Sequence, residues 1–214
     1  LNVAFRYRGF KAGAQPPVTP GSLLSSAARS SFSTLSTSLG GQHGLAIARV
    51  GSSQVESVGL LTTGAAWSTI KVPMSMAALI QDPNANSTDI RLAIRESDNN
   101  AAARLWDFLG GGDTAASKIE NVLRSGGDTT TDVETRKLTS YSVYGQTTWS
   151  LSNQARFMAR ISQSEEGRKV LGEMRNVISS QRWGLFRIGS SPAAKGGWGP
   201  GTTAGVIDNK YFVR

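Results

Sequence analysis

The sequence contains no cysteine and a single histidine, His43, in 214 residues. The lack of cysteine excludes disulfides, cysteine nucleophiles, and cysteine-ligated zinc or iron–sulfur centres. With one histidine, a metal site built on several imidazoles is excluded, and a Ser-His-Asp hydrolase would have to use His43, which we expect to be structural. No apolar run reaches the roughly 18 residues that a membrane-spanning helix needs. We therefore expect no metal, no cofactor and no transmembrane segment.

Acidic residues are also few. The chain has 15 Asp and Glu but 23 Lys and Arg, which gives a formal net charge of +8. A basic surface attracts anionic partners such as nucleic acid, cell-wall polymers or lipid head groups, without choosing among them. The basic residues are scattered along the chain, so the simplest interpretation is a solubilising surface, and we expect no nucleic-acid partner. A polyanion-binding protein remains an alternative that only the net charge supports.

Apolar spacing and turn residues predict strands toward both ends of the chain and helices between them. Residues 1–21 are rich in proline and predict an extended segment. Residues 22–39 predict a serine-rich helix that ends at Gly40-Gly41, and 43–59 predict an antiparallel hairpin. Further helices are predicted from Ser68 onward, after Ser87, and at 101–109, 115–123, 152–162 and 167–178. Strands are predicted to start at 193–197 and to run over 205–207 and 210–213.

This order predicts an α+β (mixed α/β) fold in which an antiparallel sheet is flanked by helices. We expect a single domain over 22–214. Residues 22–66 and 180–214 would form its helix-and-sheet part, and 67–179 a mainly helical part.

The first candidate for chemistry is Ser68-Thr69-Ile70-Lys71, where a hydroxyl and an ammonium share one face of a helical turn. A serine hydroxyl is a poor nucleophile until a base removes its proton, and a partly desolvated lysine can be that base. The partial positive charge of the helix N-terminus favours a developing anion. The pattern alone is common, and a capping serine with a surface lysine is the plain alternative.

Two further motifs follow along the chain. In Ser97-Asp98-Asn99 the hydroxyl can carry a proton and the amide can orient a lysine and a substrate, although all these residues also serve as helix caps. In Lys195-Gly196-Gly197 the lysine can hold an anionic substrate group, and the glycines let a substrate lie close to a strand edge. A simple turn is the alternative there.

The ordered set of Ser-x-x-Lys, Ser-Asp-Asn and Lys-Gly-Gly resembles the penicillin-recognising serine enzymes, the class A β-lactamases and the penicillin-binding DD-peptidases. The resemblance covers about 22–214 and implies a β-lactamase/transpeptidase-like fold. It makes Ser68 the nucleophile and Lys71 the general base, directly or through Ser97. Asn99 would orient Lys71 and the substrate. The remaining implied substrate-binding residues are Lys195, Gly196, Gly197 and Trp198, and an oxyanion hole would form from the amides of Ser68 and Trp198.

The chain departs from the family in ways that bear on activity. The stretch from Ser68 to Ser97 is short, so we expect a reduced helical subdomain. Gly196 lacks the hydroxyl that the family has there, and the sequence ends at Arg214, before the family's last strand and helix. Glu134 is the candidate for the glutamate that activates water, but its surroundings differ, and a solvated loop carboxylate is the alternative.

Several aromatic and amide side chains are further candidates. Tyr141, Tyr144 or Gln146 could reach the site in place of Glu134, and Trp67 would either line the site or pack in the core.

The sequence therefore predicts a serine acyl-enzyme hydrolase that acts on β-lactams or D-Ala-D-Ala-like amides of peptidoglycan stem peptides, with weak turnover. It would be secreted or held in the cell envelope, after removal of a signal peptide. The alternative is a non-catalytic cell-wall or partner-binding protein on the same fold. The oligomeric state is open.

Overall fold

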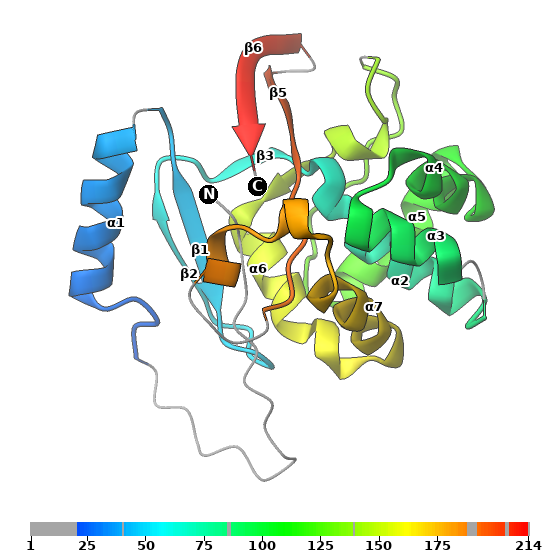
Figure 1. Cartoon of the computed structure of the whole chain (residues 1–214), viewed down its shortest axis with the longest axis horizontal. Coiled ribbons are helices and arrows are strands. Elements are labelled where there is room, and N and C mark those ends of the chain that lie inside the picture. The colour runs from blue at the N-terminus through cyan, green and yellow to red at the C-terminus, as the bar shows by residue number, and fades with distance from the viewer. Residues whose placement is uncertain are drawn as a thin grey trace, which may run out of the picture.

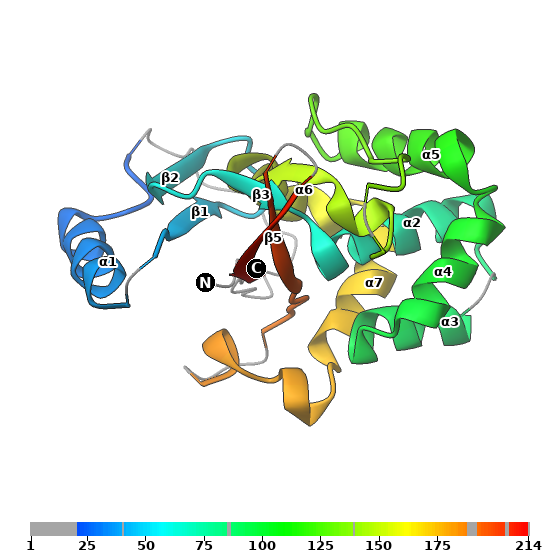
Figure 2. The ribbon, with the colours of Figure 1, turned by 90° about the horizontal axis from the view of Figure 1, so that it is seen from above.

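A computed structural model describes residues 21–39, 41–84, 87–138, 140–187, 192–203 and 206–213. Helix α1 (Ser26–Leu39) and the hairpin of β1 (Gly44–Ala48) and β2 (Val55–Gly59) lie on one side of the molecule. Helices α2–α5 and α7 gather on the other side, and β3 and β5 pass between the two parts (Figures 1 and 2). The predicted extended segment 1–21 falls outside the described residues except for Gly21. The assignment of 22–214 to one domain stays a prediction.

The predicted α+β fold is confirmed, and every strand pair in the described ranges is antiparallel. Strand β1 pairs with β2 from Gly44↔Gly59 to Ala48↔Val55. Strands β3 (Thr63–Ala65) and β4 (Thr148–Ser150) form a second ladder, and β5 (Trp198–Thr203) and β6 (Val206–Val213) a third. These are separate two-stranded ladders within the described residues, whereas the sequence predicted one sheet.

The C-terminal strands differ in detail from the prediction. The strand expected to start within 193–197 begins at Trp198, so Lys195 and Gly196 precede it. Strand β6 runs unbroken through Asp208 and Asn209, where a break was expected. The reason is the irregularity between Pro200 and Thr202 in β5, which absorbs the change of register and lets pairing resume.

The helical part is built around α2 (Lys71–Gln81), which is buried from Lys71 through Leu79. A helix that is apolar on all sides belongs in a core, and α2 packs against α4 (Asn99–Phe108), α5 (Gly112–Ser125) and α7 (Glu165–Arg175). Helix α3 (Ser87–Arg91) continues into a π-helical turn, Leu92–Glu96. Helix α6 (Leu151–Arg160) lies between the two parts of the molecule and packs on β1 and β2.

Hydroxyl and carboxylate caps fix where several of these helices start. Asp98 accepts a hydrogen bond from the Ala101 amide at 2.6 Å and caps α4, and Ser150 and Ser164 cap α6 and α7 in the same way. In the part of the chain that is described, no helix combines the length and apolar character needed to cross a bilayer. His43 contacts the Ser36 hydroxyl through Nδ1 at 3.1 Å, which joins β1 to α1.

Candidate active site

The Ser68 motif lies on a short 3₁₀ turn, Trp67–Ile70, that leads directly into α2. Ser68 is partly exposed, whereas Lys71, one turn later, is only 1% exposed. The predicted helix start near Ser68 therefore agrees with the structure. The turn is unusual because Trp67, immediately before Ser68, has a φ of 46°.

The Lys71 ammonium is bound by the Ser97-Asp98-Asn99 segment. Its Nζ donates to the carbonyl oxygens of Ser97 at 2.7 Å and Asp98 at 3.2 Å, and to Asn99 Oδ1 at 2.8 Å. The left-handed conformation of Ser97 (φ 60°) ends the π-helical turn before the Asp98 cap, where the backbone changes direction. An ammonium has three N–H donors, so these acceptors use all of them.

The protonation of Lys71 reflects two opposing effects. Burial favours the neutral amine and lowers the pKa of Lys71 to about 8, while the negative charge of Asp98 acts in the opposite direction. At pH 7 the ammonium still exceeds the free amine by about tenfold. Lys71 is therefore poised to act as a base mainly above neutral pH.

Lys195 joins the same cluster from the segment that leads into β5. Its Nζ donates to Ser97 Oγ at 2.7 Å and to the Gly196 carbonyl at 3.0 Å, and the residue is 7% exposed. Burial and the nearby charge of Lys71 hold the pKa of Lys195 well below its usual value. Lys195 also lines a recess together with Val72, Met158 and Met174.

No described carboxylate lies within ion-pair distance of Lys71 or Lys195. Two buried basic groups, Lys71 bound by the Ser97 carbonyl and Lys195 by the Ser97 hydroxyl, favour a negatively charged ligand or a developing oxyanion beside them. Because Ser97 Oγ accepts from Lys195, its own proton is available to a further acceptor.

Gly197 brings the start of β5 directly over the nucleophile turn. A Cβ at Gly197 would lie 3.0 Å from the Ser68 amide nitrogen and 2.9 Å from the Ala66 carbonyl oxygen, so only glycine allows this approach. Alternate residues of a strand share a face, so Gly199 also faces the turn and Trp198, 40% exposed, points the other way. The structure thus brings together Ser68, Lys71, Ser97, Asn99, Lys195, Gly196 and Gly197, with Trp198 at the edge.

Glu134 is not bound into this cluster. Its Oε1 accepts from the amides of Thr135 and Arg136 and from Arg136 Nε, and its Oε2 accepts from Arg136 Nη2 at 2.8 Å. The guanidinium of Arg136 lowers the pKa of Glu134. A carboxylate held in this way is a weak base, because these hydrogen bonds must be given up when it takes a proton.

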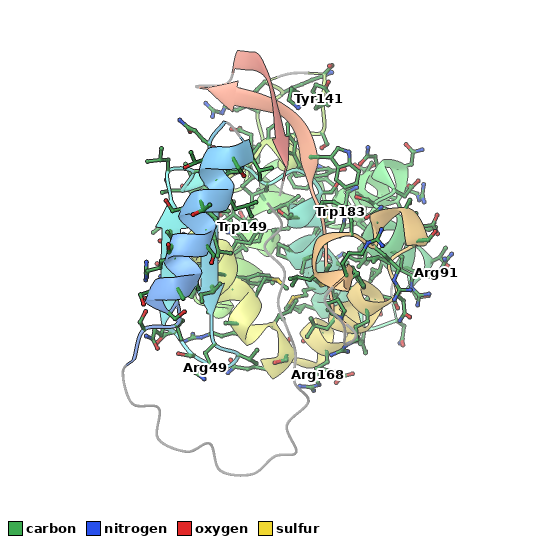
Figure 3. The ribbon with its side chains drawn as sticks, turned by 60° about the vertical axis from the view of Figure 1, so that its left-hand side comes forward. Arg49, Arg91, Tyr141, Trp149, Arg168 and Trp183 are labelled. Carbon is green, nitrogen blue, oxygen red and sulfur yellow. The ribbon has the colours of Figure 1, made fainter. Side chains whose placement is uncertain are left out.

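The loop before β4 supplies the remaining candidates. Tyr144 is buried and its ring lies 5.2 Å from Trp106, and burial raises the pKa of Tyr144 to about 12. Gln146 Nε2 donates to the carbonyls of Tyr141 and Ser142 and thereby closes the loop on itself. Tyr141 makes an edge-to-face contact with Trp67 at 5.5 Å. Figure 3 shows Tyr141 at the periphery of the molecule and Trp149 in its interior.

The sequence left open whether Trp67 lines the site or packs in the core, and the structure buries it beside Ser68; the contribution of Gly199 was not predicted. A Cβ at Gly199 would lie 2.6 Å from the Trp67 ring. The alternation of Gly197 and Gly199 is the signal that could have indicated a strand face pressed against another element.

The fold of the chain is similar to that of known β-lactamases. No family model and no curated protein sequence matches the chain. Solved structures of class A β-lactamases do. The β-lactamase of Streptomyces albus G superimposes with a TM-score of 0.58 at 18% identity, over 82% of this chain and 81% of that chain.

Two other solved structures give the same result. The W229D mutant of the class A β-lactamase of the last common ancestor of Gram-negative bacteria has a TM-score of 0.55 at 18% identity, over 82% of this chain and 79% of that chain. The β-lactamase of Desulfarculus baarsii has a TM-score of 0.53 at 18% identity, with 84% and 79% covered. The predicted β-lactamase-like fold is thereby confirmed. The partial coverage agrees with a divergent, trimmed version of it.

Proposed function

We propose that this protein is a serine acyl-enzyme hydrolase that is acylated at Ser68 by β-lactams or D-Ala-D-Ala-like amides and releases the product slowly. The observation that carries the proposal is the hydrogen-bonded chain Lys71–Ser97–Lys195 beside the Ser68 turn. It supplies a lysine with a lowered pKa, a serine proton donor and a positive potential around one partly exposed hydroxyl.

In the proposed acylation, Ser68 Oγ attacks the amide carbonyl and its proton passes to Lys71. For this step Lys71 must first be neutral, so that it gives up one of its three hydrogen bonds to the 97–99 acceptors and directs its lone pair at the Ser68 hydroxyl. The amide nitrogens of Ser68 and Trp198 would stabilise the oxyanion, since β5 passes directly over Ser68. As the C–N bond breaks, Ser97 would protonate the leaving nitrogen and take a replacement proton from the Lys195 ammonium that is hydrogen-bonded to its oxygen.

Slow release follows from the position of Glu134. Hydrolysis of an acyl-enzyme needs an activated water, and general-base assistance is typically worth 10²–10⁴-fold in rate. The Glu134 carboxylate is paired with Arg136 and its pKa is lowered, so it contributes little of this assistance. The ester formed at Ser68 should persist.

Labelling with a fluorescent penicillin tests the proposal. We expect a covalent adduct of one acyl group on wild type and none on Ser68→Ala, since the alanine variant lacks only the hydroxyl. Intact-mass spectra would confirm the stoichiometry and follow the loss of the adduct over hours. If folded wild type forms no adduct at high penicillin concentration and long incubation, the acyl-enzyme proposal is wrong.

A non-catalytic binding protein is the second candidate. It is favoured by the fully hydrogen-bonded Lys71 ammonium, which is not free to act as a base, and by the departure from the family at Gly196. Either function suits a protein that is secreted or held in the cell envelope and meets peptidoglycan, which we propose as its location. Noncovalent retention on peptidoglycan without labelling would support this candidate.

A further inference from the structure

Trp67 combines features that a residue of the core does not ordinarily have. It is 5% exposed and has a φ of 46°, a left-handed conformation that is unfavourable for a bulky side chain. Its indole Nε1 is buried and has no hydrogen-bond partner among the described residues. Both features cost free energy, so the surrounding packing must hold Trp67 in place.

That packing is supplied from two sides by glycines. On one side, Gly199 of β5 lies so close that a Cβ there would be 2.6 Å from Cε2 and 2.8 Å from Cζ2 of the indole. On the other side, a Cβ at Gly145 would be 3.4 Å from Cε3 and 3.6 Å from the Trp67 Cα. Tyr141 adds an edge-to-face contact with the ring, with centroids 5.5 Å apart. Trp67 is therefore wedged between β5 and the loop that contains Tyr144–Gln146.

The wedge determines how β5 meets the nucleophile. Gly197 and Gly199 lie on the same face of the strand, two residues apart. Gly199 rests on the Trp67 ring, and Gly197 rests on the amides of Ser68 and Thr69. The thickness of the indole thus sets the separation between β5 and the Ser68 amide, and the left-handed backbone at Trp67 sets the direction in which that amide points.

We propose that Trp67 is a positioning residue that holds the Ser68 amide and hydroxyl in register with β5. The proposal rests on the acyl-enzyme function in that its effect on rate would be seen in acylation of Ser68. Because Trp67 is buried, it acts through Ser68 and β5 without touching the substrate. A displacement of the reacting groups by about 1 Å can cost on the order of 10²-fold in rate, so a smaller side chain at this position should slow acylation strongly.

Substitution of Trp67 and of a matched tryptophan tests the proposal. Trp106 is a suitable control, since it is a partly buried tryptophan that packs on Tyr144 and is not adjacent to Ser68. We expect Trp67→Leu to lower the second-order rate of acylation by fluorescent penicillin on the order of tenfold or more, and Trp67→Phe to restore most of it. Trp106→Leu should lower the melting temperature and leave the acylation rate of the folded protein within about threefold of wild type.

The substitution Gly199→Ala changes the same contact with Trp67 from the side of β5. It should slow acylation by itself, because the added methyl group meets the indole. The double variant Gly199→Ala/Trp67→Leu should acylate faster than Gly199→Ala alone, since the smaller side chain makes room for the methyl group. Strictly additive losses would contradict the wedge, because independent sites add and sites in contact do not.

The positioning role of Trp67 can also be tested without acylation, by following the backbone amide of Ser68. The amide resonance of Ser68 should shift, and its hydrogen exchange should quicken about tenfold or more, in Trp67→Leu and not in Trp106→Leu. If wild type is not acylated yet the Ser68 amide responds in this way, the enzyme function fails and the positioning role stands. If a folded Trp67→Leu keeps the wild-type acylation rate or an unchanged Ser68 amide, the positioning role is wrong.

Discussion

The two sides of Ser68 differ in what their charged side chains are bound to. On the side of α2 and β5, Lys71 and Lys195 are buried, meet at Ser97 and pair with no described carboxylate. On the side of the loop before β4, the Glu134 carboxylate is held by the neighbouring Arg136. On the first side the two lysines are held by the Ser97–Asn99 segment beside the Ser68 turn, whereas on the second side the carboxylate is held by the next residue but one. This difference is the physical basis for expecting fast acylation relative to deacylation.

Replacement of Lys71 should have the largest effect on the acylation rate, because it removes the proposed base and its hydrogen bonds to residues 97–99. We expect Lys71→Met to slow acylation of Ser68 by about 10²–10⁴-fold. In wild type the rate should rise with pH up to about 8 and then level, since the neutral amine becomes the major form there. Stopped-flow labelling between pH 6 and pH 10 measures both. Lys118→Met, at a partly buried lysine on α5 outside the site, should keep the wild-type profile.

The second side is anchored by Asp128, and its loss should mainly affect stability. Asp128 is fully buried and accepts from Trp149 Nε1 at 2.7 Å and from the amides of Thr130 and Thr131. Asp128→Ala removes a buried acceptor of three hydrogen bonds and should lower the free energy of unfolding by about 3 kcal/mol. Asp132→Ala, at a side chain that is 89% exposed, should change it by less than about 0.5 kcal/mol. Equal urea midpoints for the two variants would contradict this assignment.

The dependence of stability on pH should reveal the buried lysine. The pKa of Lys71 is lowered to about 8 in the folded protein, so between about pH 8 and 10 the unfolded chain binds more protons. Stability should therefore rise with pH across this window, with up to about 1.4 kcal/mol per pH unit from this one group. Lys71→Met should reduce the slope of unfolding free energy against pH. Identical slopes for the two proteins would show that the ammonium of Lys71 is well solvated.

Glu134→Gln should have the smallest effect on turnover, because the Glu134 carboxylate is already paired with Arg136. We expect nitrocefin hydrolysis to be slow in wild type and to change by less than about threefold in the variant. Rapid wild-type turnover that collapses in Glu134→Gln, with the adduct accumulating, would show that Glu134 turns toward Ser68 in the acyl-enzyme. The carboxylate of Glu134 would then be available for catalysis, as Lys71 is proposed to be.

Much of the fold could be predicted from the sequence, because its signals are local. Helix α1, the β1–β2 hairpin and the start of the central helix near Ser68 follow from apolar spacing, glycine turns and the position of Pro73. The strand boundary at Trp198 and the unbroken β6 could not be predicted. Strand limits depend on pairing between residues distant in sequence, here on the irregular register around Pro200–Thr202.

For the site, the sequence by itself determined which chemical groups are available: a serine and a lysine one helical turn apart, an Asn99 amide, a second lysine at 195 and no thiol or imidazole cluster. Only the tertiary structure decided what those groups face. Ser97 binds Lys195 across 98 residues of chain and also holds Lys71, whereas Glu134 pairs with a residue two positions away. Residue type and spacing set the chemistry that is possible, whereas hydrogen-bond partners and burial set pKa and direction. Those depend on contacts, such as the one between Trp67 and Gly199, that form only when distant segments pack together.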